Sequence, residues 1–458
     1  MYNTTTTILT EITKHMKDKD LILSDLAREA EMNPGTMSSI INGNRTLSVD
    51  QLDRITKAMG HPVGYYYERY VSEYLTEANP NWRRMSPFIH NCAKLNKLDC
   101  IHDVVNLLMD KLGYSESLFE LAEELFHEKM YQAAAILYEN VAVSEKKQYS
   151  ERLAMCQYRL FHTRQGDNQE KNYEAAVQFE IYVDRLDEID QLEALKDLAN
   201  TYRSLRKWDK VELFAKALGD KAKIQYKLEQ QRHHVKKENS KKPSFPLFAY
   251  WAFSHLLRAE ACEARKDYEQ ALQHTYAYAD LSWVKDTDET ALKWKRQYEE
   301  WAVGNTYLNK ILAGEINVLS DYVVYISSRK DEILPALDII VDSANRYHID
   351  VDDILKQFNE DISSFLEQQK VESFYTRRFI TERFMHFSKE LSVYYLTKGR
   401  FTDGFKFLIS CLEKSTLINN KSYIIKCMRL YESYREYAST EIKVAYRNLI
   451  NEVEKDET

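Results

Sequence analysis

Glycine and proline are scarce along the whole chain, and this scarcity limits the folds available to it. Only 11 glycines and 7 prolines occur in 458 residues, whereas the two together average roughly 12% of a soluble protein. Sandwiches, barrels and Gly-rich phosphate-binding loops need more of these turn residues. Hydrophobic residues make up 44% of the chain, which suffices for a large core. The sequence therefore predicts an all-α protein of long helices and short turns, with length for roughly three domains.

Other properties exclude whole classes of protein. The first ten residues lack the basic and apolar segments of a signal peptide, and no stretch approaches the roughly 18 uninterrupted apolar residues of a membrane helix. Six scattered cysteines without CxxC spacing predict reduced, mostly buried thiols in the cytoplasm. The net charge of −8 disfavours non-specific polyanion binding. Nucleophile-elbow, phosphate-loop and paired-carboxylate motifs are absent from the sequence, so we expect no enzyme activity and no cofactor.

The first sixty residues divide into four short helical segments separated by capping residues. Ser24 is placed to cap the second segment, because its hydroxyl can accept a hydrogen bond from an unpaired backbone N–H. Asn33 and Pro34 fit the cap and first position of a third helix, expected over 35–42. Ser48 and Gln51 form a capping-box pattern, which opens a fourth helix that ends near residue 60.

This order of elements resembles the helix-turn-helix of the Cro/repressor-like transcription factors over residues 8–60. The shared features lie in the run LSDLAREAEMNPGTMSSIINGNRTLSVDQLDRITKAMG. They are the Leu-Ala pair of the second helix, the small Ala30 before the turn, the Ser39-containing third helix and the Asn-Gly that follows. The resemblance implies that the third helix enters the major groove of double-stranded DNA.

The resemblance also implies a set of DNA-binding residues. They are Arg28, Asn33, Gly35, Thr36, Ser38, Ser39, Asn42 and Arg45. The third helix contains no Arg or Lys, so the strongest guanine-reading contact is missing. Residues 1–72 hold eight basic and nine acidic side chains, so we expect one copy to bind weakly and a homodimer to be needed. The alternative is a helical protein-interaction module without DNA binding.

A second pattern recurs from about residue 65 onward. An apolar helix is followed by a short turn with one aromatic residue and then by a helix that opens with alanine. The pattern is clearest at 121–142, 198–218 and 259–279, is looser at 390–412, and follows an expanded turn at 166–172. The expected turn aromatics are Tyr131, Tyr173, Trp208, Tyr268 and Phe401.

This layout resembles the tetratricopeptide repeat, a helix-turn-helix unit of about 34 residues. The resemblance covers most of residues 115–440 and implies a right-handed superhelix whose concave face binds a short linear peptide. A helical solenoid of another class is the alternative, and it would also provide a concave groove.

Aligning the first helix of each repeat places a set of side chains on that concave face. They are Asn200, Arg203, Ser204, Glu260, Glu263, Asn305 and Asn309. An Asn side chain offers a donor and an acceptor together, so it can hold the N–H and C=O of an extended peptide. Arg203 suits a peptide carboxylate, and the two glutamates suit a basic group. The alternative is that each Asn is solvated or stabilises its repeat.

Two other features are weaker candidates. His233 and His234 lie in a polar, Lys-rich run, but no acid or thiol completes a metal site at recognisable spacing. That run is more typical of an exposed loop. Trp82, Arg83 and Arg84 follow the Asn-Pro pair at 79–80, where we expect a hinge anchor between two domains.

The two resemblances together are typical of the peptide-responsive regulators of Gram-positive bacteria and their phages, the RRNPP family. Residues 65–99 look most similar to arbitrium-type phage receptors and their bacterial relatives. The expected domains are 1–64 (DNA-binding), 65–114 (linker and degenerate repeat), 115–440 (peptide-binding repeats) and 441–458 (cap and tail). The resemblance implies a cytoplasmic homodimer, for which we expect contacts through the C-terminal helices. The rival interpretations are a repeat scaffold and an inhibitor of a partner protein.

Overall fold

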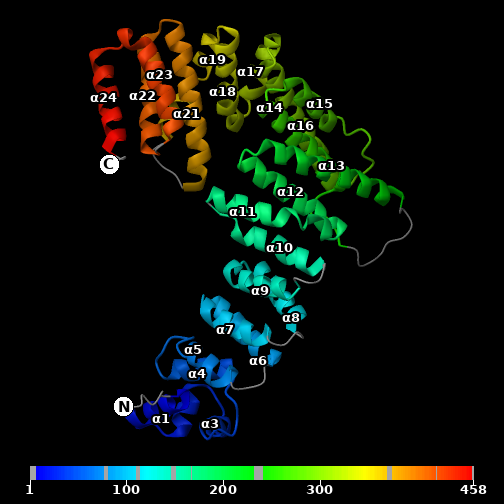
Figure 1. Ribbon diagram of the computed structural model, residues 1–458, viewed down its shortest axis with the longest axis vertical. Helices are drawn as coiled ribbons and strands as arrows, with labels where there is room; N and C mark the ends of the chain where they lie inside the picture. The colour runs from blue at the N-terminus through cyan, green and yellow to red at the C-terminus, as the bar shows by residue number, and fades with distance from the viewer. Residues whose placement is uncertain are drawn as a thin grey trace. The chain divides into compact units, whose positions relative to one another are not determined.

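The computed structural model (Figure 1) describes residues 7–76, 81–109, 114–145, 151–166, 168–231, 241–368, 374–418 and 420–455. Helices account for 81% of the described residues, and these residues contain no β-strand. The all-α class predicted from the sequence is therefore confirmed. The chain divides into two compact units, residues 1–194 and 195–458, with the boundary inside α12 (Glu188–Ser204).

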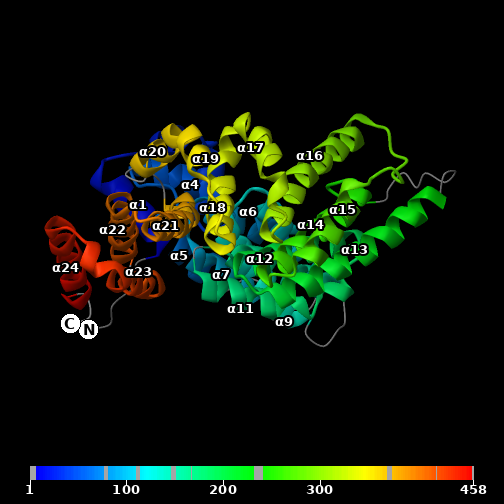
Figure 2. The ribbon, with the colours of Figure 1, turned by 90° about the horizontal axis from the view of Figure 1, so that it is seen from above.

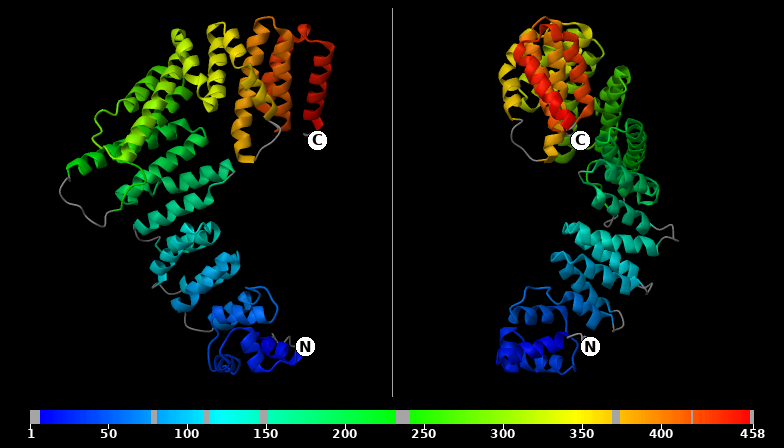
Figure 3. Two further views of the ribbon diagram at one scale, coloured as in Figure 1. Left: turned by 180° about the vertical axis from the view of Figure 1, so that it is seen from behind. Right: turned by 60° about the vertical axis from the view of Figure 1, so that its left-hand side comes forward.

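The first unit consists of short helices that pack on their neighbours along the chain. They are α1 (Ile8–Asp18), α2 (Leu23–Glu29), α3 (Pro34–Ile41), α4 (Val49–Ala58), α5 (Tyr67–Tyr70), a π-helical turn (Val71–Leu75), α6 (Trp82–Lys94), α7 (Leu98–Met109), α8 (Ser115–His127), α9 (Tyr131–Ser144), α10 (Glu151–Arg164) and α11 (Gln169–Glu180), before a 3₁₀ turn (Val183–Arg185) and the start of α12. Helix α2 contacts α3 and α4. Further along the chain α6 contacts α7, α7 and α8 both contact α9, and α9, α10 and α11 pack in sequence, in the stack of helices that Figure 3 shows.

Most of the predicted caps in the first sixty residues are confirmed. The Asn33 side chain accepts hydrogen bonds from the first turn of α3, with Pro34 at the first helical position. Ser48 and Gln51 form the complete capping box of α4. The prediction for Ser24 is wrong, because α2 begins at Leu23 after Ile22, which has no capping side chain.

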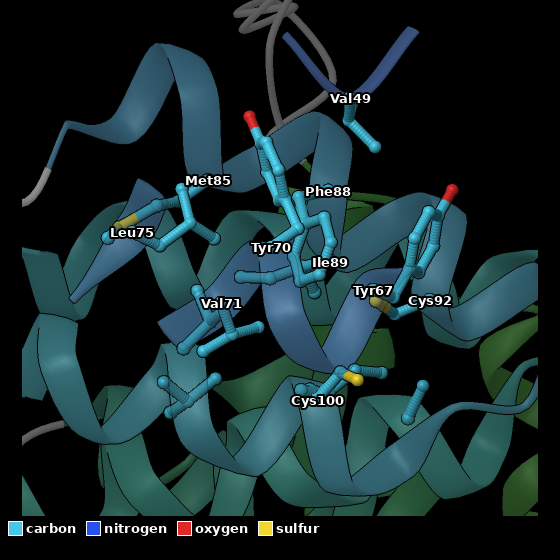
Figure 4. Close-up of a cluster of buried hydrophobic side chains, with 14 of the residues drawn as sticks. Val49, Tyr67, Tyr70, Val71, Leu75, Met85, Phe88, Ile89, Cys92 and Cys100 are labelled. Atoms are coloured by element: carbon cyan, nitrogen blue, oxygen red, sulfur yellow. The ribbon is translucent and has the colours of Figure 1, made fainter. Parts of the chain in front are cut away.

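A tyrosine-rich segment joins the first four helices to α6. Tyr67, Tyr70 and Phe88 belong to the cluster of buried side chains drawn in Figure 4. The centroids of the Tyr67 and Tyr70 rings lie 4.9 and 5.4 Å from that of the Phe88 ring. The Tyr67 hydroxyl donates to Asp53 Oδ2 and the Tyr70 hydroxyl donates to the carbonyl of Leu47, each at 2.8 Å. These buried hydroxyls are therefore satisfied by α4 and the loop before it, which holds α4 and α6 together.

The second unit contains longer helices. After the end of α12 they are α13 (Trp208–Gln231), α14 (Leu247–Ala264), α15 (Tyr268–Ala279), α16 (Glu289–Leu312), a 3₁₀ turn (Ile316–Val318), α17 (Leu319–Ser327), α18 (Lys330–Tyr347), α19 (Asp352–Gln357), α20 (Asn359–Gln368), α21 (Phe374–Thr397), α22 (Phe401–Leu417), α23 (Lys421–Tyr434), a second 3₁₀ turn (Arg435–Tyr437) and α24 (Thr440–Lys455). Helices α13 to α16 pack in sequence, α17 and α18 follow (Figure 2), and α18 contacts α21.

One turn geometry recurs at five helix–helix connections. In each, a residue with positive φ ends the first helix, and the second helix begins two residues later. The left-handed residues are Asn96, Lys129, Arg206, Lys266 and Gly399, and the second helices begin at Leu98, Tyr131, Trp208, Tyr268 and Phe401. The residue after each left-handed position donates its N–H to the carbonyl five residues back, which satisfies the end of the first helix.

Four of the five predicted turn aromatics occupy this first position of a second helix. Tyr173 differs, because α11 begins four residues earlier, at Gln169. Asn168 caps that helix by accepting hydrogen bonds from the N–H groups of Glu170 and Lys171. An upstream N-cap therefore places Tyr173 inside the helix.

The C-terminal helix covers an apolar face of its own unit. Helix α24 packs on α22, and the Tyr431 and Tyr446 rings stack at 3.6 Å between centroids. Leu417, Ile425 and Val444 remain exposed on these C-terminal helices. The apolar end of the unit is thus partly covered within the chain.

Two further expectations concern the whole sequence. All six cysteines are buried and free, as predicted, and the Sγ atoms of Cys411 and Cys427 lie 3.4 Å apart. Among the described residues, no helix combines the length and apolar character that a membrane crossing requires. The His233–His234 run and the Asn-Pro pair at 79–80 lie outside the described residues.

Candidate functional site

Helix α3 presents the predicted DNA-binding residues at the surface of the first unit. Thr36, Ser38 and Ser39 are half-buried, and Asn33, Gly35, Asn42 and Arg45 are exposed. The apolar side chains Met37 and Ile40 point the other way and are fully buried. The local sequence thus orients the helix by its apolar face and leaves the hydroxyl-bearing face open to solvent.

Several polar groups of this surface are already engaged within the helix. Asn33 Oδ1 accepts from the N–H groups of Gly35 and Thr36, at 2.8 and 3.3 Å. The Ser39 hydroxyl donates to the carbonyl of Gly35 at 2.9 Å, and Asn42 Nδ2 donates to Ser38 Oγ at 3.2 Å. Asn33 therefore positions the N-terminus of α3, and fewer hydroxyl protons are free to read base edges than the sequence suggests.

The cations around α3 are few. Arg28 pairs with Asp25 on α2 at 2.9 Å but is 77% exposed, so this ion pair contributes little and exchanges readily. Arg45 lies exposed in the loop after α3. Arg54 pairs with Asp50 and donates to the carbonyl of Glu31. The surface therefore offers two basic groups for phosphate contacts, Arg28 and Arg45.

In the second unit, the structure brings together several residues predicted to bind peptide. The Arg203 guanidinium on α12 pairs with the Glu260 carboxylate on α14, with Nη2 and Oε1 2.6 Å apart. One turn along α14, Glu263 Oε1 accepts a 2.6 Å hydrogen bond from Asn309 Nδ2 on α16. Asn305 donates to the hydroxyl of Tyr278 at 2.8 Å. These contacts join α12, α14, α15 and α16 into one polar network.

Burial dominates the electrostatics of that network. It raises the pKa of Glu263 to about 7, although the hydrogen bond from Asn309 acts in the opposite direction. Burial also raises the pKa of Glu260 above its usual range, and Arg203 opposes that shift. The pKa of the Tyr278 hydroxyl rises to about 12 for the same reason. Glu263 can therefore exchange a proton near neutral pH.

One predicted residue, Asn309, is placed differently from expectation. Asn309 was expected on an open concave face, but its side chain is fully buried and its Oδ1 accepts no hydrogen bond. Packing of α16 against α14 encloses it, so it supports Glu263 and is inaccessible to a ligand. The Ser204 hydroxyl donates to its own helix at Thr201. Asn200 is half-buried and joins none of the network's hydrogen bonds given above.

A pocket of about 510 Å³ lies within the second unit. Its lining comes from the turn after α12, from α18, from α21 and from the start of α23. The lining residues are Arg206, Asp338, Arg383, His386, Asn420, Ser422, Tyr423 and Lys426. Ligand pockets commonly measure about 300–1,000 Å³, so this one can hold a small ligand or part of a peptide.

An ion pair organises one wall of the pocket. His386 Nδ1 lies 2.6 Å from Asp338 Oδ1, and this contact raises the pKa of the imidazole. Burial raises the pKa of Asp338. On another wall, the ammonium of Lys426 lies 4.5 Å from the centre of the Tyr423 ring, a cation–π contact that orients the side chain.

Sequence reasoning missed every residue of this pocket. Arg206 and Lys426 are 220 positions apart along the chain, and none of the eight residues forms a local motif. Only Arg206 is close to a predicted site residue, three positions after Arg203. The predicted concave face was derived from the first helix of each repeat, and no sequence signal linked the turn after α12 to partners on α18, α21 and α23.

Two clusters of side chains have donor atoms close enough to hold a metal ion. They are Glu212, Cys262 and His274, and Asp342, His386 and Glu390. In the first, Arg258 Nε already donates to Glu212 at 2.8 Å. In the second, Lys389 pairs with Glu390 at 2.6 Å. Because protein cations already neutralise these acids, we assign no metal to either cluster.

No protein-family model matches the chain, and a search of the curated proteins finds no match. The function is therefore argued from the residues, from the geometry of the two sites and from the resemblances noted in the sequence.

Proposed function

We propose that the chain is a peptide-responsive transcriptional regulator of the RRNPP type. Its first helices form a Cro-like helix-turn-helix that binds promoter DNA, and its later helices form a tetratricopeptide-like array that binds a short linear peptide. The observation that carries the proposal is the pocket of about 510 Å³ in residues 195–458, with its charged and polar lining.

The first four helices support the DNA-binding part of the proposal. Helix α3 packs on α2, leaves Thr36 half-buried, and exposes Asn42 and the loop residue Arg45. The helix N-terminus, capped by Asn33, favours a phosphate. Direct base contacts fall to Thr36 and Asn42, whose hydroxyl and amide groups suit base edges.

The recurrent turns support the repeat part of the proposal. Five helix pairs share one left-handed turn residue and one start position for the second helix. The residue three positions after the start of each second helix is buried. In two of the five helices this residue is an alanine, Ala134 or Ala271. A repeated unit of this kind buries its helices against its neighbours, which is how solenoids build extended binding surfaces.

Peptide binding regulates DNA binding only if the peptide prefers one state of the protein. A ligand with equal affinity for two conformations does not change their relative populations. We propose that the peptide selects one arrangement of the repeat helices in a homodimer and so changes the spacing of the two DNA-binding helices. Operator half-sites then match that spacing.

A gel-shift titration tests the DNA-binding part. We expect the full chain to retard a duplex from upstream of its own gene more strongly than a shuffled duplex at moderate salt. Thr36→Ala should weaken the specific shift, while Lys57→Gln, which changes an exposed residue in the last turn of α4, should not. Equal retardation of both duplexes would contradict sequence-specific binding.

A peptide titration tests the concave-face assignment. Asn200→Ala and Asn305→Ala each remove an amide from the predicted peptide-binding face, and we expect each to weaken binding of a short peptide encoded beside the gene. Unchanged affinity in both variants would remove that face from the proposal.

A repeat scaffold or partner-protein inhibitor is the second candidate function. The absence of Arg and Lys from α3 favours it, because the strongest base contact is then lost. Such a protein would give no sequence-specific shift at any concentration, yet it would still capture a protein partner.

A further inference from the structure

Two buried cysteines of the second unit face each other across neighbouring helices. Cys411 lies on α22 and Cys427 on α23, and these two helices pack together (Figure 1). Their side chains are 0% and 1% exposed, and their Sγ atoms lie 3.4 Å apart. Sulfur atoms at this distance are already in contact, so a bond between them requires only a small approach of the two helices.

Hydrogen bonds hold both thiols in this position. The Cys427 thiol donates to Cys411 Sγ. The Cys411 thiol in turn donates to the carbonyl of Met385 on α21, at 3.3 Å. Each sulfur is therefore fixed by a contact with the next helix, and the two remain aligned in the folded chain.

The two thiols differ in acidity. The hydrogen bond from Cys427 lowers the pKa of the Cys411 thiol, and the nearby Lys389 and His386 act in the same direction against the effect of burial. The same hydrogen bond, together with burial, raises the pKa of the Cys427 thiol. Because the thiolate is the nucleophile in thiol chemistry, Cys411 is the sulfur that reacts first.

The pocket described above brings solvent close to this pair. Its lining residue His386 directly follows Met385 in the chain, and its lining residue Lys426 directly precedes Cys427. A molecule as small as hydrogen peroxide that enters the pocket needs only a local fluctuation of α21 or α23 to reach the sulfurs.

We infer that Cys411 and Cys427 form a reversible disulfide when the chain meets a peroxide. The Cys411 thiolate attacks one oxygen of hydrogen peroxide, the O–O bond breaks, and the displaced hydroxide takes up the thiol proton as water, which leaves a sulfenic acid on Cys411. The Cys427 sulfur then attacks the Cys411 sulfur. The S–S bond forms, the S–O bond breaks, and the hydroxide leaves with the Cys427 proton as a second water. The two thiols together lose two electrons, and the peroxide gains them.

The disulfide links one wall of the pocket to the helix behind it. Helix α23 supplies Ser422, Tyr423 and Lys426 to the lining. Once Cys427 is bonded to Cys411, α23 cannot separate from α22, so oxidation fixes this wall. The inference goes beyond the proposed function and does not depend on what the pocket binds.

The test uses the full chain, freed of reductant and treated with a small molar excess of hydrogen peroxide. Circular dichroism verifies that the chain stays folded. Free thiols are then alkylated in denaturant, and the chain is digested without reduction and mapped by mass spectrometry. We expect the loss of two alkylatable thiols, a peptide pair linked through Cys411 and Cys427, and recovery of both thiols with dithiothreitol.

A second measurement follows the pocket wall. Hydrogen exchange of the α23 amides should slow in the oxidised chain and return to its original rate on reduction, because the link suppresses local opening of that helix. The amides of α10, in the first unit, should exchange at the same rate in both forms.

Matched variants locate the effect. Cys427→Ala removes the second sulfur, so Cys411 should remain as a sulfenic acid that dimedone traps. Cys156→Ala changes another fully buried cysteine, on α10, and should leave the linked peptide pair unchanged. The peptide map of the wild-type chain decides the inference even where a variant fails to fold.

Three results would contradict the inference. Full alkylation of Cys411 and Cys427 after peroxide treatment of the folded chain would show that the two thiols are only packed together. A linked peptide pair in which another cysteine replaces either of them would overturn the assignment. A Cys411–Cys427 link with unchanged hydrogen exchange in α23 would overturn the control of the pocket wall.

Discussion

Glu263 shows at the scale of one residue how burial changes chemistry. Its carboxylate lies between α14 and α16, where its hydrogen-bond partner is the fully buried amide of Asn309. A buried carboxylate that lacks a cation of its own is more stable when protonated. The pKa of about 7 follows from this environment, and no feature of the local sequence announces it.

This environment predicts a pH dependence of stability. Below a pH of about 4.5, Glu263 is protonated in both the folded and the unfolded chain. Between that value and about 7 the unfolded chain ionises it while the folded chain retains the proton. Stability therefore falls as pH rises through this window, by on the order of 3 kcal/mol from this residue. Glu263→Gln should remove that fall and leave the variant more stable than wild type at pH 8.

The measurement is a series of chemical denaturation curves across that pH range for wild type and variant. Other groups titrate in the same range, so the difference between the two curves is the quantity to compare. Glu269→Gln, an exposed acid on α15, is the matched control and should follow wild type. A Glu263→Gln variant with an unchanged pH profile would contradict the assignment.

Gly404 is a second residue whose role comes from close packing. A Cβ at this position would lie 2.6 Å from Leu396 Cγ and 3.1 Å from the Leu396 backbone nitrogen. Gly404→Ala should therefore destabilise the chain by about 1–3 kcal/mol, because α21 and α22 must separate. Thermal denaturation measures this, with Gly166→Ala as a control in open space. Equal melting temperatures for the two variants would show that the helix contact is looser than described.

At the scale of the element, capping residues decide where the N-terminal helices begin. Ser48→Ala removes the hydroxyl that accepts from the Gln51 N–H at 3.3 Å, and breaks the capping box of α4. We expect a loss of about 1 kcal/mol. Ser24→Ala provides the contrast, since Ser24 lies inside α2 without a capping bond, and its effect should be near zero. Denaturation midpoints compare the two, and a larger effect at Ser24 would place the start of α2 elsewhere.

The recurrent helix–helix turn explains how so few glycines suffice. Four of the five left-handed positions are occupied by Asn, Lys or Arg, and only the fifth, Gly399, is a glycine. A left-handed conformation costs a residue other than glycine about 1–2 kcal/mol, and the capping hydrogen bonds of each turn offset that cost. The chain therefore makes its sharp turns without the residue that usually marks them.

This strain is open to a direct test. Lys266 adopts φ of 63° in the turn between α14 and α15. Lys266→Gly should raise stability by about 1 kcal/mol, because glycine adopts this conformation without strain. Lys216→Gly, on an exposed face in the middle of α13, should lower stability by about the same amount. Thermal denaturation measures both variants. A gain of stability for Lys266→Gly with a loss for Lys216→Gly supports the turn geometry, and a loss of stability in both variants would contradict it.

At the scale of the whole molecule, net charge constrains the proposed DNA binding. The chain carries a net charge of −8, so its affinity for DNA must come from a few local cations. Arg45→Gln should reduce the slope of log K against log salt by about 1 for each bound copy. Lys57→Gln should leave the slope unchanged. Gel shifts at several salt concentrations measure both, and an unchanged slope for Arg45→Gln would remove it from the DNA contact.

Local sequence determined the helical class, the caps at Asn33 and Ser48, the buried free cysteines and four of the five positions where a second helix begins. The caps and helix starts depend on residues a few positions apart, the range over which capping, turn formation and helical periodicity act, and the helical class and the cysteines follow from composition. The error at Tyr173 arose because Asn168, five positions upstream, caps the helix, whereas α2 begins one residue before Ser24 without any capping side chain.

Tertiary structure alone decided the burial of Asn309, the protonation of Glu263 and the pocket that joins Arg206 to Lys426. Each depends on which helices lie against one another, and that depends on the packing of many side chains at once. Arg206, two positions after the predicted residue Ser204, thus lines a pocket whose other walls lie more than a hundred positions later in the chain. Sequence pattern placed the polar side chains on helices, and only packing determined which of them meet.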